Sequence, residues 1–136
     1  MKNDITIILD RSGSMNIIKY DVIEEFNQFI KEFKTTSLET KFNLIQFNDT
    51  VERVIINQKV ETIDFLNENN YKPEGCTSLY DAVGDTLNQK IKFLKTKRKL
   101  RDVTIAIITD GRENSSKDYS RKMIKELVTK CKEKLN

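Results

Sequence analysis

The fold of this chain is constrained most strongly by two short runs of apolar, mostly β-branched residues. Each run is followed directly by an aspartate. "DITIIL" spans residues 4–9 and precedes Asp10, and "DVTIAIIT" spans 102–109 and precedes Asp110. Such runs, nearly without polar alternation, are typical of strands covered on both faces, as in parallel sheets flanked by helices. The two runs therefore predict an α/β protein with a mainly parallel sheet.

Three other segments carry apolar residues at the three- and four-residue spacing of amphipathic helices. The first helix, ending near Lys34, is expected to bury Met15, Ile18, Val22, Phe26, Phe29, Ile30 and Phe33. The second is expected to bury Leu79, Ala82, Val83, Thr86, Leu87, Ile91 and Leu94. The last, from about Lys117 to Leu135, is expected to bury Met123, Ile124, Leu127, Val128, Cys131 and Leu135.

The middle of the chain predicts an antiparallel hairpin followed by a long loop. Strands are expected at 41–47 and 51–56, joined by a tight turn at "NDT". Residues 57–75 are the least regular: "VETIDFL" fits either a turn and a half of helix or an irregular strand, and "NENNYKPEG" has a loop composition. The element order predicts a three-layer, Rossmann-like sandwich, with a mostly parallel central sheet and one antiparallel edge strand.

Composition favours one soluble domain spanning 1–136. Charged residues make up 33% and apolar residues 38% of the chain, and the net charge of +3 is too small to indicate a nucleic-acid partner. The basic stretch 95–101 could bind phosphate, but a solvated helix end explains it better. The chain begins without a signal peptide, and its apolar runs are too short to cross a membrane, so a cytoplasmic protein is expected.

Histidine is absent, and this limits the chemistry that the chain can perform. No Ser–His or Cys–His pair can form, so the usual activated nucleophiles are excluded. The two cysteines, Cys76 and Cys131, give no disulfide framework. No P-loop or dinucleotide-binding glycine motif occurs. The sequence therefore favours a protein that is not an enzyme.

The stretch "ILDRSGSMN" places one carboxylate and two hydroxyls at alternate positions where the first strand ends. Asp10, Ser12 and Ser14 would face one side of an extended loop, and Gly13 is expected to let the backbone bend there. The simplest alternative is that the two serines only cap the following helix.

Two further loops carry oxygen donors, namely "GCTS" with Thr77 and "TDG" with Asp110. Ligands of open α/β sheets bind beyond the carboxyl ends of the strands, where the strand order reverses, so these donors are expected to meet the Asp10 loop. Two carboxylates and three hydroxyls are hard ligands that suit Mg²⁺, Mn²⁺ or Ca²⁺ and leave one octahedral position open.

Each of these loops also has an ordinary structural explanation. Thr77 could be a helix N-cap, and Asp110 could belong to a simple turn. Asp81 is expected to complete a capping box with Ser78 rather than to bind metal. Cys76 is expected to be a small filler residue, because one thiolate does not make a zinc site.

Taken together, "DRSGSM", "GCTSLYDA" and "ITDGREN" resemble the metal-ion-dependent adhesion site of von Willebrand factor type A domains, which integrin I domains also carry. The resemblance spans the whole chain and is nearest to stand-alone intracellular bacterial and viral versions. It implies that Ser12 and Ser14 ligate the metal directly, and that Thr77 joins them when a partner is bound. Asp10 and Asp110 would hold the ion directly or through waters. The open position would accept an Asp or Glu of a partner protein.

The chain departs from this family after its last expected helix. The family's sheet normally continues with at least one more strand and helix, whereas this sequence ends at Asn136. The strand at 102–109 is then expected to have an unpaired edge, which would self-associate into a homo-oligomer or accept a strand from a partner. The other explanation is a fragment or one half of a split protein.

Three functions remain open on these observations. The first is a metal-dependent module that binds a protein partner, with neither nucleic acid nor membrane involved. The second is a metal-dependent phosphohydrolase, but such enzymes need an acid two residues after the first aspartate, where this chain has Ser12. The third is a structural protein that assembles through the edge at 102–109.

Overall fold

Four strands form one mixed sheet in the computed structural model, which describes residues 2–35, 39–96, 101–110 and 123. The strands are β1 (Lys2–Asp10), β2 (Glu39–Phe47), β3 (Val51–Lys59) and β4 (Arg101–Ile108). Their order in the sheet is β3-β2-β1-β4. β1 runs parallel to both β2 and β4, and β3 runs antiparallel to β2 at one edge. The expected mostly parallel sheet with one antiparallel edge strand is confirmed.

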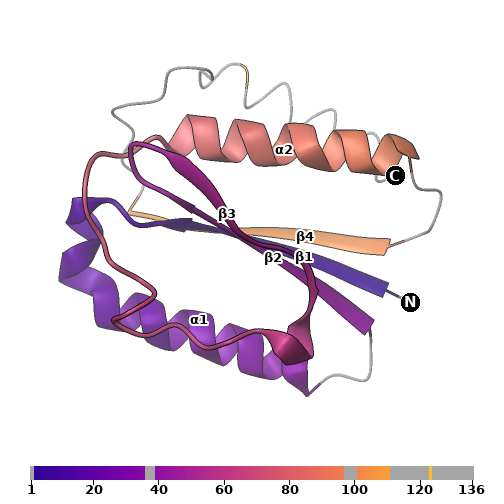
Figure 1. Cartoon of the computed structure of the whole chain (residues 1–136), viewed down its shortest axis with the longest axis horizontal. Coiled ribbons are helices and arrows are strands. Elements are labelled where there is room, and N and C mark those ends of the chain that lie inside the picture. The colour runs from indigo at the N-terminus through magenta and orange to yellow at the C-terminus, as the bar shows by residue number, and fades with distance from the viewer. Residues whose placement is uncertain (1, 36–38, 97–100, 111–122, 124–136) are drawn as a thin grey trace.

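Helices cover both faces of this sheet and produce three layers (Figure 1). One face carries the 3-10 helix η1 (Gly13–Ile18) and α1 (Lys19–Lys34), and the other carries α2 (Leu79–Thr96). A short 3-10 turn, η2 (Val60–Thr62), follows the hairpin. In the described part of the chain, none of the helices combines the length and apolar character that crossing a bilayer requires.

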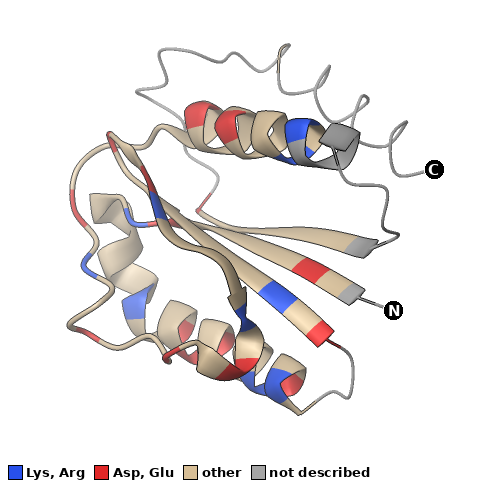
Figure 2. Cartoon of the chain, turned by 45° about the vertical axis from the view of Figure 1, so that its right-hand side comes forward, with Lys and Arg blue, Asp and Glu red and all other residues tan. Residues whose placement is uncertain are grey.

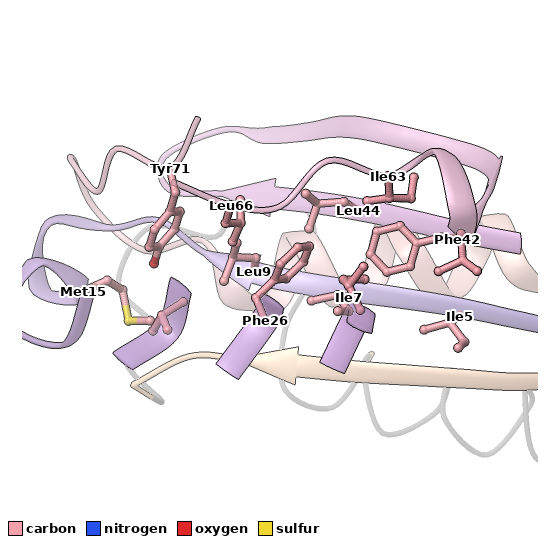
Figure 3. Close-up of a cluster of buried hydrophobic side chains, with 13 residues drawn as sticks. Ile5, Ile7, Leu9, Met15, Phe26, Phe42, Leu44, Ile63, Leu66 and Tyr71 are labelled. Carbon is pink, nitrogen blue, oxygen red and sulfur yellow. The ribbon is translucent and has the colours of Figure 1, made fainter. Parts of the chain in front are cut away.

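The larger core lies between the sheet and α1 (Figure 3). Alternate residues of β1 point into it, and Phe26 of α1 meets Phe42 of β2 edge to face, with ring centroids 6.0 Å apart. Its buried members are Ile5, Ile7, Leu9, Met15, Val22, Phe26, Ile30, Phe42, Leu44, Val60, Ile63, Leu66 and Tyr71. A smaller core lies under α2 and consists of Ile8, Ile45, Phe47, Ala82, Val83, Leu87 and Ile91.

Three details of the expected elements are wrong. Ile18 is 36% exposed, because the first helix starts as a 3-10 turn and its residues do not follow the 3.6-residue spacing until Lys19. β3 extends to Lys59, three residues beyond the expected end at position 56. Met123 is helical but 43% exposed, so it is not a core residue. The rest of the helix expected at 117–135 lies outside the described residues.

Charged residues of both signs are distributed over the helices and the strands (Figure 2). On α2 the acidic residues lie in the first half and the basic residues toward the end, which complements the helix dipole. This polarity places negative charge near the carboxyl ends of the parallel strands and positive charge near their beginnings.

Candidate metal centre

Asp10, the last residue of β1, is fully buried and holds its carboxylate between two loops. Oδ1 accepts a hydrogen bond from the backbone N–H of Ser12 at 2.8 Å. Oδ2 accepts one from the Thr109 hydroxyl at 2.7 Å, just after β4 ends. Both donors are neutral, and each carboxylate oxygen keeps a second lone pair. The geometry therefore fixes the carboxylate without neutralising its charge.

Ser12, Ser14 and Asp110 come together beside Asp10. The hydroxyl oxygens of Ser12 and Ser14 lie 3.3 Å apart, and the Ser14 hydroxyl donates to Oδ2 of Asp110. Because β1 and β4 are parallel neighbours with Leu9 opposite Ile108, the residues that follow each strand meet at the same edge of the sheet. The structure thus brings together four of the five residues that the sequence singled out.

The fifth residue, Thr77, lies in a loop that is seated on the Asp10 loop. The Gly13 N–H donates to the Gly75 carbonyl at 2.9 Å, and the Glu74 N–H donates to the Arg11 carbonyl at 2.8 Å. Thr77 is 2% exposed and stands two residues before α2 begins. These backbone bonds hold its loop at the same edge of the sheet.

The β2–β3 turn supports the Thr77 loop from behind, a role that the sequence did not reveal. The side-chain N–H₂ of Asn48 donates to the Glu74 carbonyl at 3.0 Å, and the backbone carbonyl of Asn48 accepts the Ser78 N–H at 2.8 Å. Oδ1 of Asp49 accepts the Cys76 N–H at 2.5 Å. The polar "NDT" stretch could be recognised as a turn, but its side chains also build the neighbouring loop.

Tyr71 is a second residue whose role the sequence did not reveal. It is fully buried, and its hydroxyl donates to the backbone carbonyl of Asp10 at 2.6 Å (Figure 3). Burial, followed by the negative charges of Asp10 and Asp110, raises the pKa of Tyr71. The phenol therefore stays protonated and serves as a permanent hydrogen-bond donor. An aromatic residue alone in the polar stretch "NENNYKPEG" was the only signal.

The glycine that shapes this edge is Gly75, and the role expected of Gly13 is wrong. Gly75 has φ +80°, and a Cβ on it would lie 2.3 Å from Oδ1 of Asp49. A Cβ on Gly13 would meet two backbone atoms of Gly75, the carbonyl oxygen at 3.5 Å and the nitrogen at 3.8 Å, and both are ordinary contacts. The loop of Asp10 therefore needs no glycine for steric reasons, whereas the loop of Thr77 does.

Two of the ordinary explanations can be compared with the structure. Ser12 occupies the N-cap position of η1 but makes no side-chain capping hydrogen bond, so capping does not account for its hydroxyl. Cys76 is exposed, so the expectation that it fills space in the loop packing is wrong. Its backbone N–H donates a hydrogen bond to Asp49. Ser78 directly precedes α2, and its hydroxyl donates to the Asp49 carbonyl at 3.2 Å.

The donors gathered at this edge fit a hard divalent cation. In the described part of the chain, carboxylate and thiol groups nowhere gather in threes that could hold a metal. An ion at this edge would therefore rely on hydroxyl oxygens together with two carboxylates. All these donors are oxygens, which suits Mg²⁺, Mn²⁺ or Ca²⁺ and not zinc. Ser12 and Ser14 would face the ion, with Asp10 and Asp110 supplying charge.

Solved structures similar to this chain share its fold. The vWF domain of the type V pili tip protein Mfa5 from Porphyromonas gingivalis is 19% identical, with a TM-score of 0.60, over 82% of this chain and 38% of that one. A von Willebrand factor type A structure from Catenulispora acidiphila is 15% identical, with a TM-score of 0.60, over 94% and 30%. The PilB minor pilin from Streptococcus sanguinis is 18% identical, with a TM-score of 0.59, over 82% and 30%.

This chain thus spans 30% to 38% of the length of these three structures. Comparison with curated protein sequences gives no match. The family model of the von Willebrand factor type A domain matches residues 4–134, which is nearly the whole chain. The chain therefore belongs to the von Willebrand factor type A domain family.

Proposed function

We propose that this domain binds a divalent cation, Mg²⁺ in the first place, and uses it to hold an acidic residue of a partner protein. Von Willebrand factor type A domains commonly mediate protein–protein interaction. We assign the metal site to Asp10, Ser12, Ser14, Thr77 and Asp110. The observation that carries it is the approach of Ser12, Ser14 and Asp110 to a fully buried Asp10.

The electrostatics of these donors support the proposal. The Thr109 hydroxyl donates to Asp10, and the next residue, Asp110, accepts from Ser14, so both carboxylates lie at the same edge of the sheet. A divalent cation bound there would be attracted by both charges. Because hydroxyl ligands carry no charge, the ion would stay electrophilic and would attract a further carboxylate at its open position. The partner's Asp or Glu would supply that carboxylate.

The open side of the edge offers room and contact area for a partner. Asp110 is exposed and Ser14 is half-buried, so an incoming side chain can reach the donors. Ile17, in the 3-10 helix η1 that contains Ser14, is 90% exposed, and Tyr20 at the start of α1 is 66% exposed. Large exposed apolar side chains beside a charged contact are typical of protein-binding surfaces.

The neighbouring structures fit a binding role and say nothing of catalysis. Mfa5 is a pili tip protein and PilB is a minor pilin. A phosphohydrolase of the kind considered from the sequence would need a carboxylate at position 12. That position holds Ser12, whose hydroxyl does not act as an acid or base near neutral pH. These observations favour a non-enzymatic module, and the expected cytoplasmic location stays a prediction.

Calorimetric titration of Mg²⁺ and Mn²⁺ into the purified domain tests the metal step. Asp110→Asn removes one charge from an exposed donor, so it is expected to weaken metal affinity at least tenfold while the fold is kept. Asp64→Asn is the matched control, because Asp64 is also an exposed acid but lines a hollow on the α1 side. Equal affinity of both variants and the wild type would refute the assignment.

Affinity capture tests the partner step. The wild-type domain is expected to retain a partner in Mg²⁺, to release it in chelator, and to lose it when Asp110 becomes Asn. If the partner is retained both in chelator and by Asp110→Asn, the result would favour a structural protein that assembles without the metal. Turnover of a generic phosphoester in Mg²⁺ would favour the hydrolase.

A second candidate function, self-association, rests on the position of β4. Within the described strands, β4 pairs with β1 alone and stands at the end of the sheet. An apolar edge strand offers N–H and C=O groups to a second copy. Sedimentation velocity from low to high micromolar concentration is expected to show a dimer that Ile107→Lys abolishes. Val54→Lys, on the opposite edge strand and equally half-exposed, is expected to leave it intact. A wild-type monomer at every concentration would exclude this function.

A further inference from the structure

A cavity of about 490 Å³ opens between the sheet and the second half of α2, on the face opposite α1. Its floor is formed by β1 and β2, one wall by β3, and its roof by α2. The volume lies within the range of small-molecule sites in proteins. Asp4 lines the cavity, and six steps of extended strand, about 20 Å, separate it from Asp10. The cavity is therefore separate from the candidate metal centre.

The floor of the cavity is polar, although it lies on a sheet face that is otherwise apolar. Asp4 and Asn43 are 3% and 7% exposed, and Nδ2 of Asn43 donates to Oδ1 of Asp4 at 3.1 Å. Nζ of Lys90 on α2 forms an ion pair with the same Oδ1 at 2.7 Å. Apolar residues at these positions would usually stabilise the fold as well or better. A buried polar network around an opening is typical of a binding site.

The roof carries a buried hydroxyl that has no hydrogen-bond partner among the described residues. Thr86 is 4% exposed and lines the cavity, and the hydroxyl is its Oγ1. A buried polar atom is nearly always satisfied in a native protein, by the protein, by water or by a ligand. Thr86 is thus available to a polar atom that enters the cavity.

β3 is bent so that it forms the wall. The register between β2 and β3 shifts twice, once on either side of Leu44, and Asn57 adopts φ 52° at the bend. The Asn57 N–H donates to Oδ1 of Asn43 at 2.8 Å, which connects the bend to the polar floor. Bulges of this kind re-aim side chains and are common next to functional sites.

The mouth of the cavity is apolar and cationic. Ile45 and Ile56 supply apolar surface, and Arg53 and Lys92 stand at the rim. Arg53 is ion-paired with Asp85 through Nη2 at 3.0 Å, which offsets its charge, and its Nε and Nη1 take no part in that pair. Among the lining residues in the described part of the chain, Asp4 is the only acid, and it is paired with Lys90.

We propose that this cavity binds a small amphipathic organic anion. Its apolar body would lie against Ile45 and Ile56, its anionic group would face Arg53 and Lys92, and a polar atom would meet the Thr86 hydroxyl. The ordered polar floor would fix its orientation. This site is independent of the metal and of any protein partner.

Fluorescence titration with 8-anilinonaphthalene-1-sulfonate, a probe with an apolar body and one sulfonate, tests the proposal on the full chain. One probe molecule is expected to bind per chain, with a rise in emission. Ile56→Glu removes apolar wall and adds a repelling charge at the rim, and at least tenfold weaker binding is expected. Val54→Glu is the matched control: Val54 is 48% and Ile56 51% exposed on the same strand, but Val54 lines the hollow on the α1 side.

Circular dichroism is used to check that both variants fold, which is expected since both positions are half-exposed. Thr86→Leu, whose longer apolar side chain fills part of the cavity, provides a second variant that is expected to reduce binding at least tenfold. Probe binding that is equal in the wild type, Ile56→Glu and Val54→Glu would mean that the dye binds elsewhere, and would overturn the proposal. Absence of a fluorescence change with the wild type would overturn it too.

Discussion

Gly75 shows how a single residue controls the loop that carries Thr77. Its φ of +80° lies in the left-handed region, and a Cβ there would lie 2.3 Å from Oδ1 of Asp49. Gly75→Ala is therefore expected to lower the free energy of unfolding by about 1–3 kcal/mol, from backbone strain and from displacement of Asp49. Urea denaturation monitored by circular dichroism measures this difference.

Gly13→Ala is the control for that substitution, since it adds the same methyl group in the facing loop. The added Cβ would make an ordinary contact of 3.5 Å, so the free energy of unfolding is expected to change by no more than about 0.5 kcal/mol. Equal losses in the two variants would show that the left-handed backbone of Gly75 is not what holds this edge together.

Single residues also show what the sequence could and could not predict at the site. Asp10 and Asp110 were predictable because each follows an apolar strand, and parallel strands that are neighbours bring such residues together. The sequence does not predict the role of Thr109, because the pattern indicates only that it ends a buried strand. Its hydroxyl nevertheless donates a hydrogen bond to Asp10. The contact of Tyr71 with Asp10 joins residues 61 positions apart, and no local pattern encodes it.

At the scale of elements, the strands and helices with clear periodicity were predictable, as was the loop at 67–75, whereas the conformation of residues 60–66 was not. Side chains of α1 form hydrogen bonds with the backbone of this second stretch, which belongs to no described strand. Nδ2 of Asn27 donates to the Leu66 carbonyl at 3.0 Å, and its Oδ1 accepts the Leu66 N–H at 2.7 Å. Nζ of Lys34 donates to the Ile63 carbonyl at 2.6 Å. Hydrogen bonds supplied from another element leave no periodic signal in the sequence.

β1 gives a second lesson at this scale. Its nearly apolar run predicts a strand that is covered on both faces, and Ile5, Ile7 and Leu9 do pack toward α1. The other face begins with Asp4 and Thr6, and both are buried under α2. Periodicity predicts that a strand is covered, but not whether the cover is apolar packing or a polar cavity.

At the scale of the whole molecule, the fold and the proposed metal site depend on different interactions. The two hydrophobic cores lie on opposite faces of the sheet, and the site stands at one of its edges, where the loops are already joined by backbone hydrogen bonds. Chelation by EDTA is therefore expected to leave the far-UV circular dichroism spectrum unchanged.

Thermal unfolding completes this prediction, because a ligand that binds only the native state raises stability by mass action. Mg²⁺ at a hundredfold excess over its dissociation constant would add about 2.7 kcal/mol, enough to raise Tm by several degrees. At the same Mg²⁺ concentration, Asp110→Asn with its at least tenfold weaker affinity is expected to gain no more than about half of this stabilisation, and Asp64→Asn the full amount. Loss of the helical circular dichroism signal on chelation would instead mean that the protein needs the ion to fold. It would contradict the proposal that the ion binds reversibly to an already folded domain and serves to hold a partner.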